Sequence, residues 1–244
     1  MKINALQTHS SYKNTKKLDS KMIRLVVFDM AGTTVDEQNI VYKTVHQAIL
    51  HAGFSVSLET VLLYAAGKEK FQAICDVLVY LQEGPVDMEA ALAIHRDFEA
   101  MLDHAYAELT PVPMPGATEV FKTLRERHIN IVLNTGYKRP VAEALLQKMG
   151  WTAGNEYDLL LTADDVEKSR PHPDMIFKSM DHFGIDDALE VAKIGDSIAD
   201  IEEGKNAGCG IAAGITTGAQ TAEQLKTTRP THVFHALTDL IPFL

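Results

Sequence analysis

The sequence predicts an α/β fold in which a parallel, Rossmann-like sheet carries helices on both faces and an all-helical segment is inserted after the first strand. Short apolar runs alternate with helical patterns along most of the chain, as a parallel sheet requires. One long stretch after the first run shows helical periodicity alone. The 244 residues, 46% hydrophobic and 23% charged, are enough to bury a sizeable core.

The predicted strands are short and apolar. Leu25–Phe28 is apolar throughout, as a strand buried on both faces of a sheet must be. The later runs predicted as strands are Asn130–Asn134, Asp158–Thr162, Val191–Gly195, Gly210–Gly214 and His232–Phe234. Helices are predicted between them at about 141–149, 174–183, 199–207 and 220–226, with a further helical pattern that includes Val120 and Leu124.

The inserted segment covers residues 37–110 and predicts four helices, at about 39–52, 57–65, 69–82 and 88–108. It ends at the proline-rich stretch Thr110–Gly116, which is suited to a stiff linker or hinge. We therefore expect a core domain made of residues 21–36 and 111–244, and a helical domain made of residues 37–110.

Bulk properties exclude several classes of protein. Residues 1–20 are polar and lack the apolar run of a secretory signal, so we expect a disordered leader. Cys75 and Cys209 have no metal-ligand spacing and predict reduced thiols in a cytoplasmic protein. The net charge of −10 argues against binding to nucleic acid or to an anionic membrane. No apolar stretch approaches the length of a transmembrane helix.

The segment after the first strand predicts phosphate chemistry. Asp29 stands at the edge of the sheet where α/β proteins bind ligands, and its carboxylate can attack phosphorus. Gly32 and Thr33 follow in a turn where backbone N–H groups can approach phosphate oxygens. Asp29 is therefore the expected nucleophile.

Three later segments add groups suited to the same reaction. Thr135 and Gly136 follow the second core strand and offer O–H and N–H donors to a phosphoryl oxygen. Arg170 can offset the repulsion between a carboxylate nucleophile and a phosphate dianion. Asp196 and Asp200 follow the fourth strand, and carboxylates at neighbouring strand ends can share a hard cation.

We expect this cation to be Mg²⁺. Because Mg²⁺ keeps several of its waters, Asp29, the Ala31 carbonyl oxygen and Asp196 suffice as its protein ligands. Asp200 is then expected to orient a Lys or Arg side chain, or a water, rather than to bind the ion.

Together the four segments resemble, in order, the motifs of the haloacid dehalogenase superfamily. The resemblance implies a Mg²⁺-dependent hydrolase with an aspartyl-phosphate intermediate and a small helical cap. In the common phosphatases of that superfamily a second Asp, the general acid and base, occupies the place of Ala31. Alanine cannot move a proton, so proton chemistry is expected elsewhere. The four segments are Asp29–Asp36, Thr135–Tyr137, Lys168–Asp174 and Gly195–Asp200.

One branch of the superfamily shares these departures. Ala31, and Arg170 ahead of a Pro-x-Pro segment, resemble the phosphonoacetaldehyde hydrolase (phosphonatase) family. There a cap lysine forms a Schiff base with the aldehyde, so that the carbon leaves as an enamine. The spacing after Gly67 selects Lys70 as that lysine, with Lys68 as the second choice and a substrate contact.

The resemblance is incomplete, which leaves the substrate open. Ala66 and Ala73 stand where phosphonatases have methionine and histidine. Tyr137 is expected to supply a polar contact to the substrate. The sequence therefore predicts a phosphonatase-like hydrolase that acts on a small phosphonate or phosphorylated metabolite. Two alternatives remain, a phosphomonoesterase similar to phosphoglycolate phosphatase and a non-catalytic protein that binds a phosphorylated metabolite.

Overall fold

The computed structural model describes residues 22–244 except 66, 67, 69 and 83. Six strands form one sheet in the order β5-β4-β1-β6-β7-β8, and every pairing is parallel. The predicted α/β class is therefore confirmed. The expected leader, together with Ala66 and Gly67, lies outside the described residues. The six strands are β1 (Leu25–Asp29), β4 (Asn130–Asn134), β5 (Leu159–Leu161), β6 (Val191–Gly195), β7 (Ile211–Ile215) and β8 (His232–Phe234).

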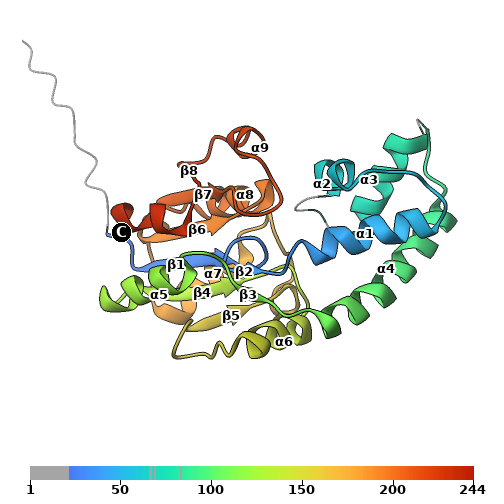
Figure 1. Ribbon diagram of the computed structural model, residues 1–244. Helices are drawn as coiled ribbons and strands as arrows, with labels where there is room; N and C mark the ends of the chain where they lie inside the picture. The colour runs from blue at the N-terminus through green and yellow to red at the C-terminus, as the bar shows by residue number, and fades with distance from the viewer. Residues whose placement is uncertain (1–21, 66–67, 69, 83) are drawn as a thin grey trace, which may run out of the picture.

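Helices cover both faces of this sheet (Figure 1). Val26 and Phe28 of β1 pack on one face, and Leu25 and Val27 pack on the other, as strand alternation requires. The first face is covered by α5 (Ala117–Glu126), α6 (Arg139–Met149) and the 3₁₀ segment η3 (Leu237–Phe243). The second face is covered by α7 (Asp174–Phe183) and α8 (Ile198–Ala207), while α9 (Ala222–Lys226) packs on β7 and β8.

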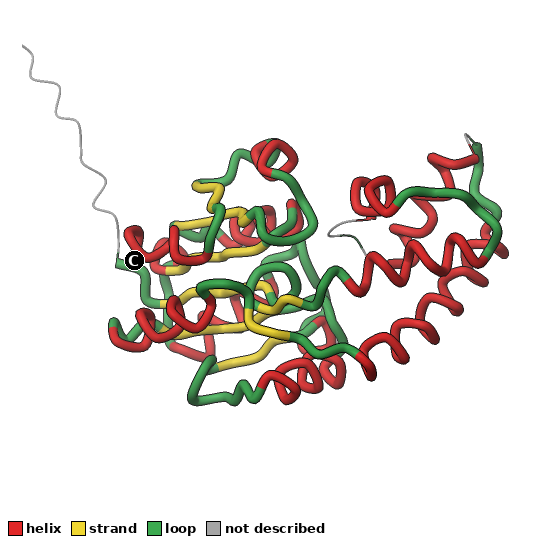
Figure 2. Tube along the Cα trace, in the orientation of Figure 1, coloured by secondary structure: helices red, strands yellow, loops and turns green. Residues whose placement is uncertain are grey.

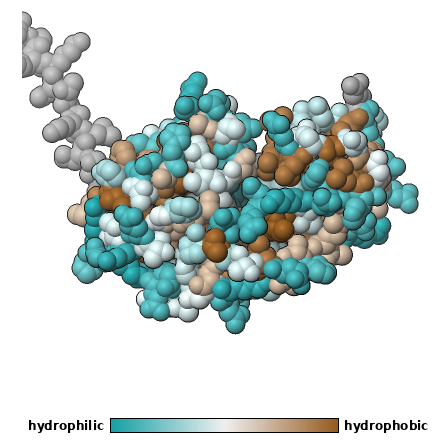
Figure 3. Space-filling model, viewed as in Figure 1, coloured by the Kyte–Doolittle hydropathy of each residue, from teal (hydrophilic) through white to brown (hydrophobic). Residues whose placement is uncertain are grey.

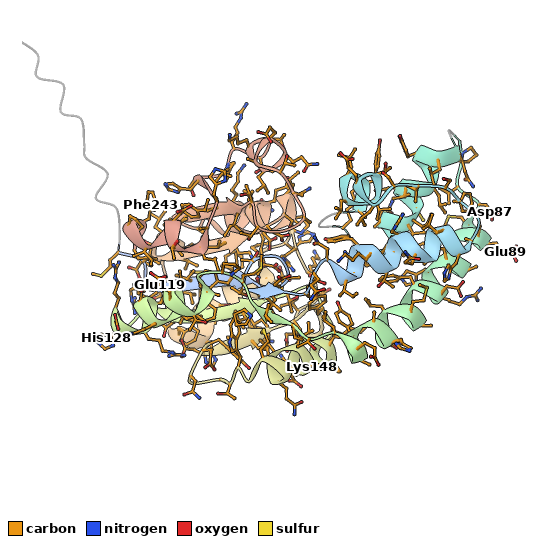
Figure 4. All side chains as sticks on the ribbon, in the orientation of Figure 1. Asp87, Glu89, Glu119, His128, Lys148 and Phe243 are labelled. Atoms are coloured by element: carbon orange, nitrogen blue, oxygen red, sulfur yellow. The ribbon has the colours of Figure 1, made fainter. Side chains whose placement is uncertain are left out.

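Four helices form a separate layer beyond the carboxyl ends of the strands (Figure 1). They are α1 (Ile40–His51), α2 (Leu58–Ala65), α3 (Lys70–Gln82) and α4 (Met88–Glu108), close to the four predicted ranges. We call these four helices the helical unit. They enclose their own apolar cluster, which includes Val45, Ile74 and Phe98. The Asp87 side chain accepts the N–H groups of Glu89 and Ala90 and so begins α4 at the far end of the unit (Figure 4).

Two chain crossings join the sheet to the helical unit, and they pair with each other. β2 (Val35–Asp36) and β3 (Val112–Pro113) form an antiparallel ribbon. The Met114 N–H continues the pairing by donating to the Thr34 carbonyl at 2.9 Å. The proline-rich stretch was expected to be a stiff linker or hinge. Two residues per strand are too few to show alternation, so the sequence did not predict the ribbon.

A lysine of the sheet layer holds the end of α4. Lys148 on α6 donates from Nζ to the carbonyl oxygens of Tyr106, Ala107 and Leu109, each at 2.8 Å (Figure 4). The last carbonyls of a helix have no partner inside it, and a cation is favoured there by the helix dipole. Lys148 therefore fixes the end of the helical unit to α6.

The helical unit exposes apolar side chains. Apolar side chains gather on the helical unit on the face that Figure 3 shows, and exposed members of the unit include Leu63, Val79, Tyr80, Met88 and Leu92. No described helix combines the length and the apolar character needed to cross a membrane. Neither Cys75 nor Cys209 forms a disulfide bond in the part of the chain that the structure describes.

Replacing Lys148 with Met should lower the free energy of unfolding by about 1–3 kcal/mol, because three carbonyl oxygens lose a charged donor. Urea unfolding followed by circular dichroism measures the change. Lys122→Met is the matched control, since Lys122 is exposed and its ion pair with Glu126 spans 4.0 Å. Equal stability of the two variants would contradict the conclusion that Lys148 fixes the end of α4 to α6.

Candidate active site

The candidate site lies where the carboxyl ends of β1, β4 and β6 meet. These three strands are neighbours in the sheet, so the residues that follow them come together. Figure 2 shows loops gathered at this edge, facing the helical unit. Asp29 ends β1, Thr135 follows β4, and Asp196 follows β6. All three side chains are buried.

Arg170 joins two of the carboxylates. Its Nη1 donates to Asp29 Oδ1 at 2.8 Å and also to Asp200 Oδ1. Gly136 lies beside the same guanidinium, because a Cβ at this position would stand 3.5 Å from Arg170 Nη2. The structure thus brings together Asp29, Arg170 and the Thr135-Gly136 loop, as the sequence predicted.

Burial and charge act in opposite directions on these acids. Burial raises the pKa of Asp29 to about 6, while the Arg170 charge opposes that rise. Burial also acts on Asp200, but Arg170 and Lys193 hold the pKa of that carboxyl well below its usual range. The pKa of Asp196 is raised by burial and by the negative charges of Asp29 and Asp200. Asp196 is therefore the carboxylate that most lacks a compensating cation.

The donor set fits a divalent cation. Ligand atoms of Asp29, Asp196 and Asp200 lie within 4.8 Å of one another. Both Asp200 oxygens are already engaged, Oδ1 by Arg170 and Lys193 and Oδ2 by the Ser197 hydroxyl. Asp29 and Asp196 are thus the better placed ligands, and hard carboxylate oxygens suit Mg²⁺.

Charge balance points the same way. Four carboxyl groups are buried together in and beneath the site, and in the described part of the chain they form ion pairs with two cations, the buried Lys193 and the largely buried Arg170. When all four are ionised, they exceed these two cations by two negative charges, which one divalent ion would offset, since unpaired buried charge is costly. The four carboxylates are Asp29, Asp196, Asp200 and Glu203.

Two glycines let the backbone approach Asp196. A Cβ on Gly218 would stand 2.0 Å from Asp196 Oδ2, and a Cβ on Gly32 would stand 2.7 Å from the same oxygen. Gly32 also has φ 74°, a conformation that favours glycine. The Ala219 N–H donates to this oxygen at 2.6 Å, which orients the carboxylate. The sequence analysis did not single out the 218–219 loop, which approaches the site from beyond β7.

The turn after β1 is tightly organised. The N–H groups of Thr33, Thr34 and Val35 point to the Met30 carbonyl oxygen, and the Thr34 hydroxyl donates to the Asp29 carbonyl at 2.9 Å. The Thr33 hydroxyl is buried and has no hydrogen-bond partner among the described residues. A buried hydroxyl without a partner is available to an incoming oxygen ligand.

The two candidate lysines contact the helical unit. Lys68 forms an ion pair with Asp76. Lys70 is the first residue of α3, donates to the Lys68 carbonyl oxygen, and places Nζ 5.1 Å from the centre of the Tyr42 ring. Ala73, where phosphonatases have histidine, is buried in the apolar cluster of the unit.

The sequence analysis missed a buried polar network beneath Arg170. Lys193 Nζ lies 2.9 Å from Asp200 Oδ1, 3.3 Å from Glu203 Oε2 and 2.7 Å from Asn134 Oδ1. The Asn134 amide in turn donates to Glu203 at 2.9 Å. Two signals were present in the sequence, a lysine inside the apolar run Val191–Gly195 and a glutamate one helical turn after Asp200. The network ties β4, β6 and α8 together.

Comparison with known proteins finds a matching family model and relatives of about 30% identity. A protein-family model described as a haloacid dehalogenase-like hydrolase matches residues 23–208. A phosphonoacetaldehyde hydrolase from Bacillus cereus (strain B4264) is 30% identical over an alignment of 217 residues, and the match covers 84% of this chain and 81% of that protein. A bifunctional phosphonoacetaldehyde hydrolase/aminoethylphosphonate transaminase from Clostridioides difficile is 30% identical over an alignment of 203 residues, and the match covers 79% of this chain and 31% of that protein.

Solved structures share the fold at lower identity. A phosphonoacetaldehyde hydrolase-like protein from Oleispira antarctica has a TM-score of 0.72 and 20% identity, and the match covers 91% of each chain. A predicted phosphoglycolate phosphatase from Haemophilus somnus has a TM-score of 0.74 and 17% identity, with 91% of this chain and 97% of that chain covered.

Replacing Gly218 with Ala should weaken Mg²⁺ binding about 10- to 100-fold, because the added methyl group collides with the Asp196 carboxylate. Calorimetric titration with MgCl₂ measures the affinity. Gly84→Ala is the matched control, since the nearest atom to its Cβ is 3.6 Å away. The same Mg²⁺ affinity in both variants would count against the site.

Proposed function

The chain belongs to the haloacid dehalogenase-like hydrolases, and from this premise we propose that it is a phosphonatase-like hydrolase that cleaves a small phosphonate or phosphorylated metabolite at Asp29. The observation that carries the proposal is the buried Asp29 carboxylate, held against Arg170 beside Asp196 at the end of β1. Ala31, which cannot act as an acid or base, favours the phosphonatase branch over the common phosphatases.

Asp29 is the proposed nucleophile. A carboxylate oxygen attacks phosphorus, the bond from phosphorus to the leaving atom breaks, and an aspartyl-phosphate forms. Arg170 offsets the repulsion between the carboxylate and the phosphoryl oxygens. Thr33, Thr135 and Gly136 supply donors that orient those oxygens. Water then hydrolyses the aspartyl-phosphate and restores Asp29.

The proposed metal ligands are Asp29, the Ala31 carbonyl oxygen and Asp196. A bound Mg²⁺ would offset the negative charge of the phosphoryl oxygens. Asp200 pairs with Arg170 and is itself held by Lys193, which supports an orienting role for Asp200.

Lys70 is the proposed Schiff-base lysine. Its amine condenses with an aldehyde or ketone carbonyl and releases water, and the resulting iminium accepts the electrons of the breaking P–C bond to give an enamine. Lys70 lies on the helical unit, which we propose to be the cap and to close toward Asp29 over the β2–β3 ribbon. The cation–π contact with Tyr42 keeps Lys70 close to an apolar surface.

A phosphomonoesterase is the second candidate, and Ala73 favours it. The position is buried among apolar side chains, so nothing there replaces the histidine that phosphonatases use beside the imine. Such an enzyme would act on a phosphate ester without need of Lys70.

The deciding experiment is a turnover screen that sets phosphonoacetaldehyde beside small phosphate esters in the presence of MgCl₂. Asp29→Asn should lower turnover of every accepted substrate by at least about 10³-fold, or about 4 kcal/mol in the barrier, because the nucleophile is lost. EDTA should abolish turnover and MgCl₂ should restore it. An Asp29→Asn variant as active as the parent would overturn the proposed nucleophile.

Borohydride reduction in the presence of phosphonoacetaldehyde separates the two candidates. We expect a stable adduct on Lys70, detected by peptide mass spectrometry, and its loss in Lys70→Ala. Lys68→Ala is the matched control from the same segment and should keep the adduct. Full phosphonoacetaldehyde turnover in Lys70→Ala would exclude the Schiff base and favour the phosphomonoesterase.

A further inference from the structure

One lysine lies at the centre of the buried polar network of the site. Lys193 is the middle residue of β6 and is fully buried. Its Nζ donates to Asn134 Oδ1 at 2.7 Å. The same Nζ lies 2.9 Å from Asp200 Oδ1 and 3.3 Å from Glu203 Oε2. An ammonium group has three N–H donors, so these three partners match its capacity and fix its position.

The contact with Asn134 leads to the loop after β4. Asn134 is the last residue of β4 and is fully buried, and Thr135 follows it directly. The Asn134 amide is held at both ends, because its oxygen accepts from Lys193 while its nitrogen donates to Glu203 at 2.9 Å. The Thr135 hydroxyl accepts the Tyr137 N–H at 3.2 Å, which restricts the directions in which its own O–H can donate. Lys193 thus holds the residue from which the Thr135 loop begins.

The contact with Asp200 leads to Arg170. Asp200 Oδ1 lies between two cations, since it accepts from Arg170 Nη1 and lies 2.9 Å from Lys193 Nζ. The same Arg170 Nη1 donates to Asp29 Oδ1 at 2.8 Å. Lys193 is therefore joined to the proposed nucleophile through Asp200 and Arg170. A shift of the Asp200 carboxylate would change the contact that holds the guanidinium.

A glycine in α8 makes room for the lysine. A Cβ on Gly204 would stand 2.9 Å from Lys193 Cβ and 3.2 Å from Lys193 Cγ. Glycine inside a helix costs about 0.5–1 kcal/mol relative to alanine, so its place here is explained by the close approach of α8 to β6. Burial lowers the pKa of Lys193, but the carboxylates of Asp200 and Glu203 hold it above its usual value. The side chain is therefore a buried cation.

We propose that Lys193 is a positioning residue that sets the spacing between the two arms of the phosphoryl site, which are the Thr135-Gly136 loop and Arg170. The inference rests on the proposed function, in which both arms face the phosphoryl oxygens. Because it is fully buried, Lys193 acts through Asn134 and Asp200 rather than on the substrate. A displacement of about 1 Å in such a site can cost about 100-fold in rate, so these contacts matter for turnover.

A purely structural role would make Lys193 the counter-ion of Glu203, and a pair of substitutions separates the two roles. Lys193→Met alone leaves Glu203 as a buried carboxylate without its cation, which threatens folding. Combining Lys193→Met with Glu203→Gln removes both charges of that pair and keeps an amide beside Asn134. If charge balance were the whole role of Lys193, this double variant would regain parental activity.

We expect the double variant to fold, as judged by circular dichroism, and to turn over phosphate esters and phosphonates about 10- to 100-fold more slowly than the parent. It should also bind inorganic phosphate about 10-fold more weakly in calorimetric titration with MgCl₂ present. The fitted stoichiometry separates the causes. A partly unfolded sample has fewer sites of parental affinity, whereas a displaced site gives the full number of weaker sites.

Asn134→Ala provides a second test that removes no charge. It cuts the contact with the Thr135 loop and leaves Lys193 paired with both of its carboxylates. We expect weaker phosphate binding at full stoichiometry here too, which keeps the inference testable if the double variant fails to fold.

Lys205→Met is the matched control, since Lys205 is exposed on the same helix and donates to the Thr228 carbonyl. It should keep the parental rate and phosphate affinity. Parental phosphate affinity in either folded variant, or fewer sites of parental affinity, would overturn the inference alone. A parent protein that turned over neither class of substrate would overturn the proposed function, whereas the phosphate titration would still test the positioning role.

Discussion

The guanidinium of Arg170, shared between Asp29 and Asp200, is the interaction on which the rest of the site depends. It brings the end of β1 to the start of α8 and keeps two buried carboxylates from repelling each other. Lys193 continues the pattern one layer deeper by joining Asp200 to Glu203. Breaking a buried pair of this kind leaves an uncompensated charge, which costs about 3–5 kcal/mol. The alternation of charges therefore holds Asp29, the proposed nucleophile, in one orientation.

Sheet topology explains why these groups meet. β4, β1 and β6 are adjacent and parallel, so the residues that follow them share one edge of the sheet. Gly32 and Gly218 then let two loops approach Asp196 more closely than any side chain would allow. The result is a buried concentration of carboxylates whose charge exceeds that of the cations beside them, which is the environment that a divalent ion compensates.

The β2–β3 ribbon and Lys148 connect the helical unit to the sheet layer that holds the site. The β2–β3 ribbon pairs both chain crossings, and Lys148 fixes the end of α4 to α6. The helical unit is thus joined to the sheet layer near one end, and it carries Lys70. Such an arrangement suits the proposed closure, in which a substrate enters and water is then excluded. In the proposed mechanism, Lys70 of the helical unit supplies chemistry that Ala31 cannot.

The sequence by itself determined the elements of secondary structure and the motif residues. Leu25–Phe28 and the later apolar runs became strands, because apolar periodicity is a local property of the chain. Asp29, Thr135, Arg170 and Asp196 could be identified because each follows a strand or precedes a helix in a recognisable order.

Only the tertiary structure decided which buried charges meet. Lys193 looked like one residue of an apolar strand until Asn134, Asp200 and Glu203 surrounded it. Glu37 gave no signal in the sequence, yet only 2% of its surface is exposed in the fold. Burial and charge pairing arise from contacts between segments far apart in sequence, and no local pattern encodes them. The chemistry of an acid such as Glu37 therefore emerges with the fold.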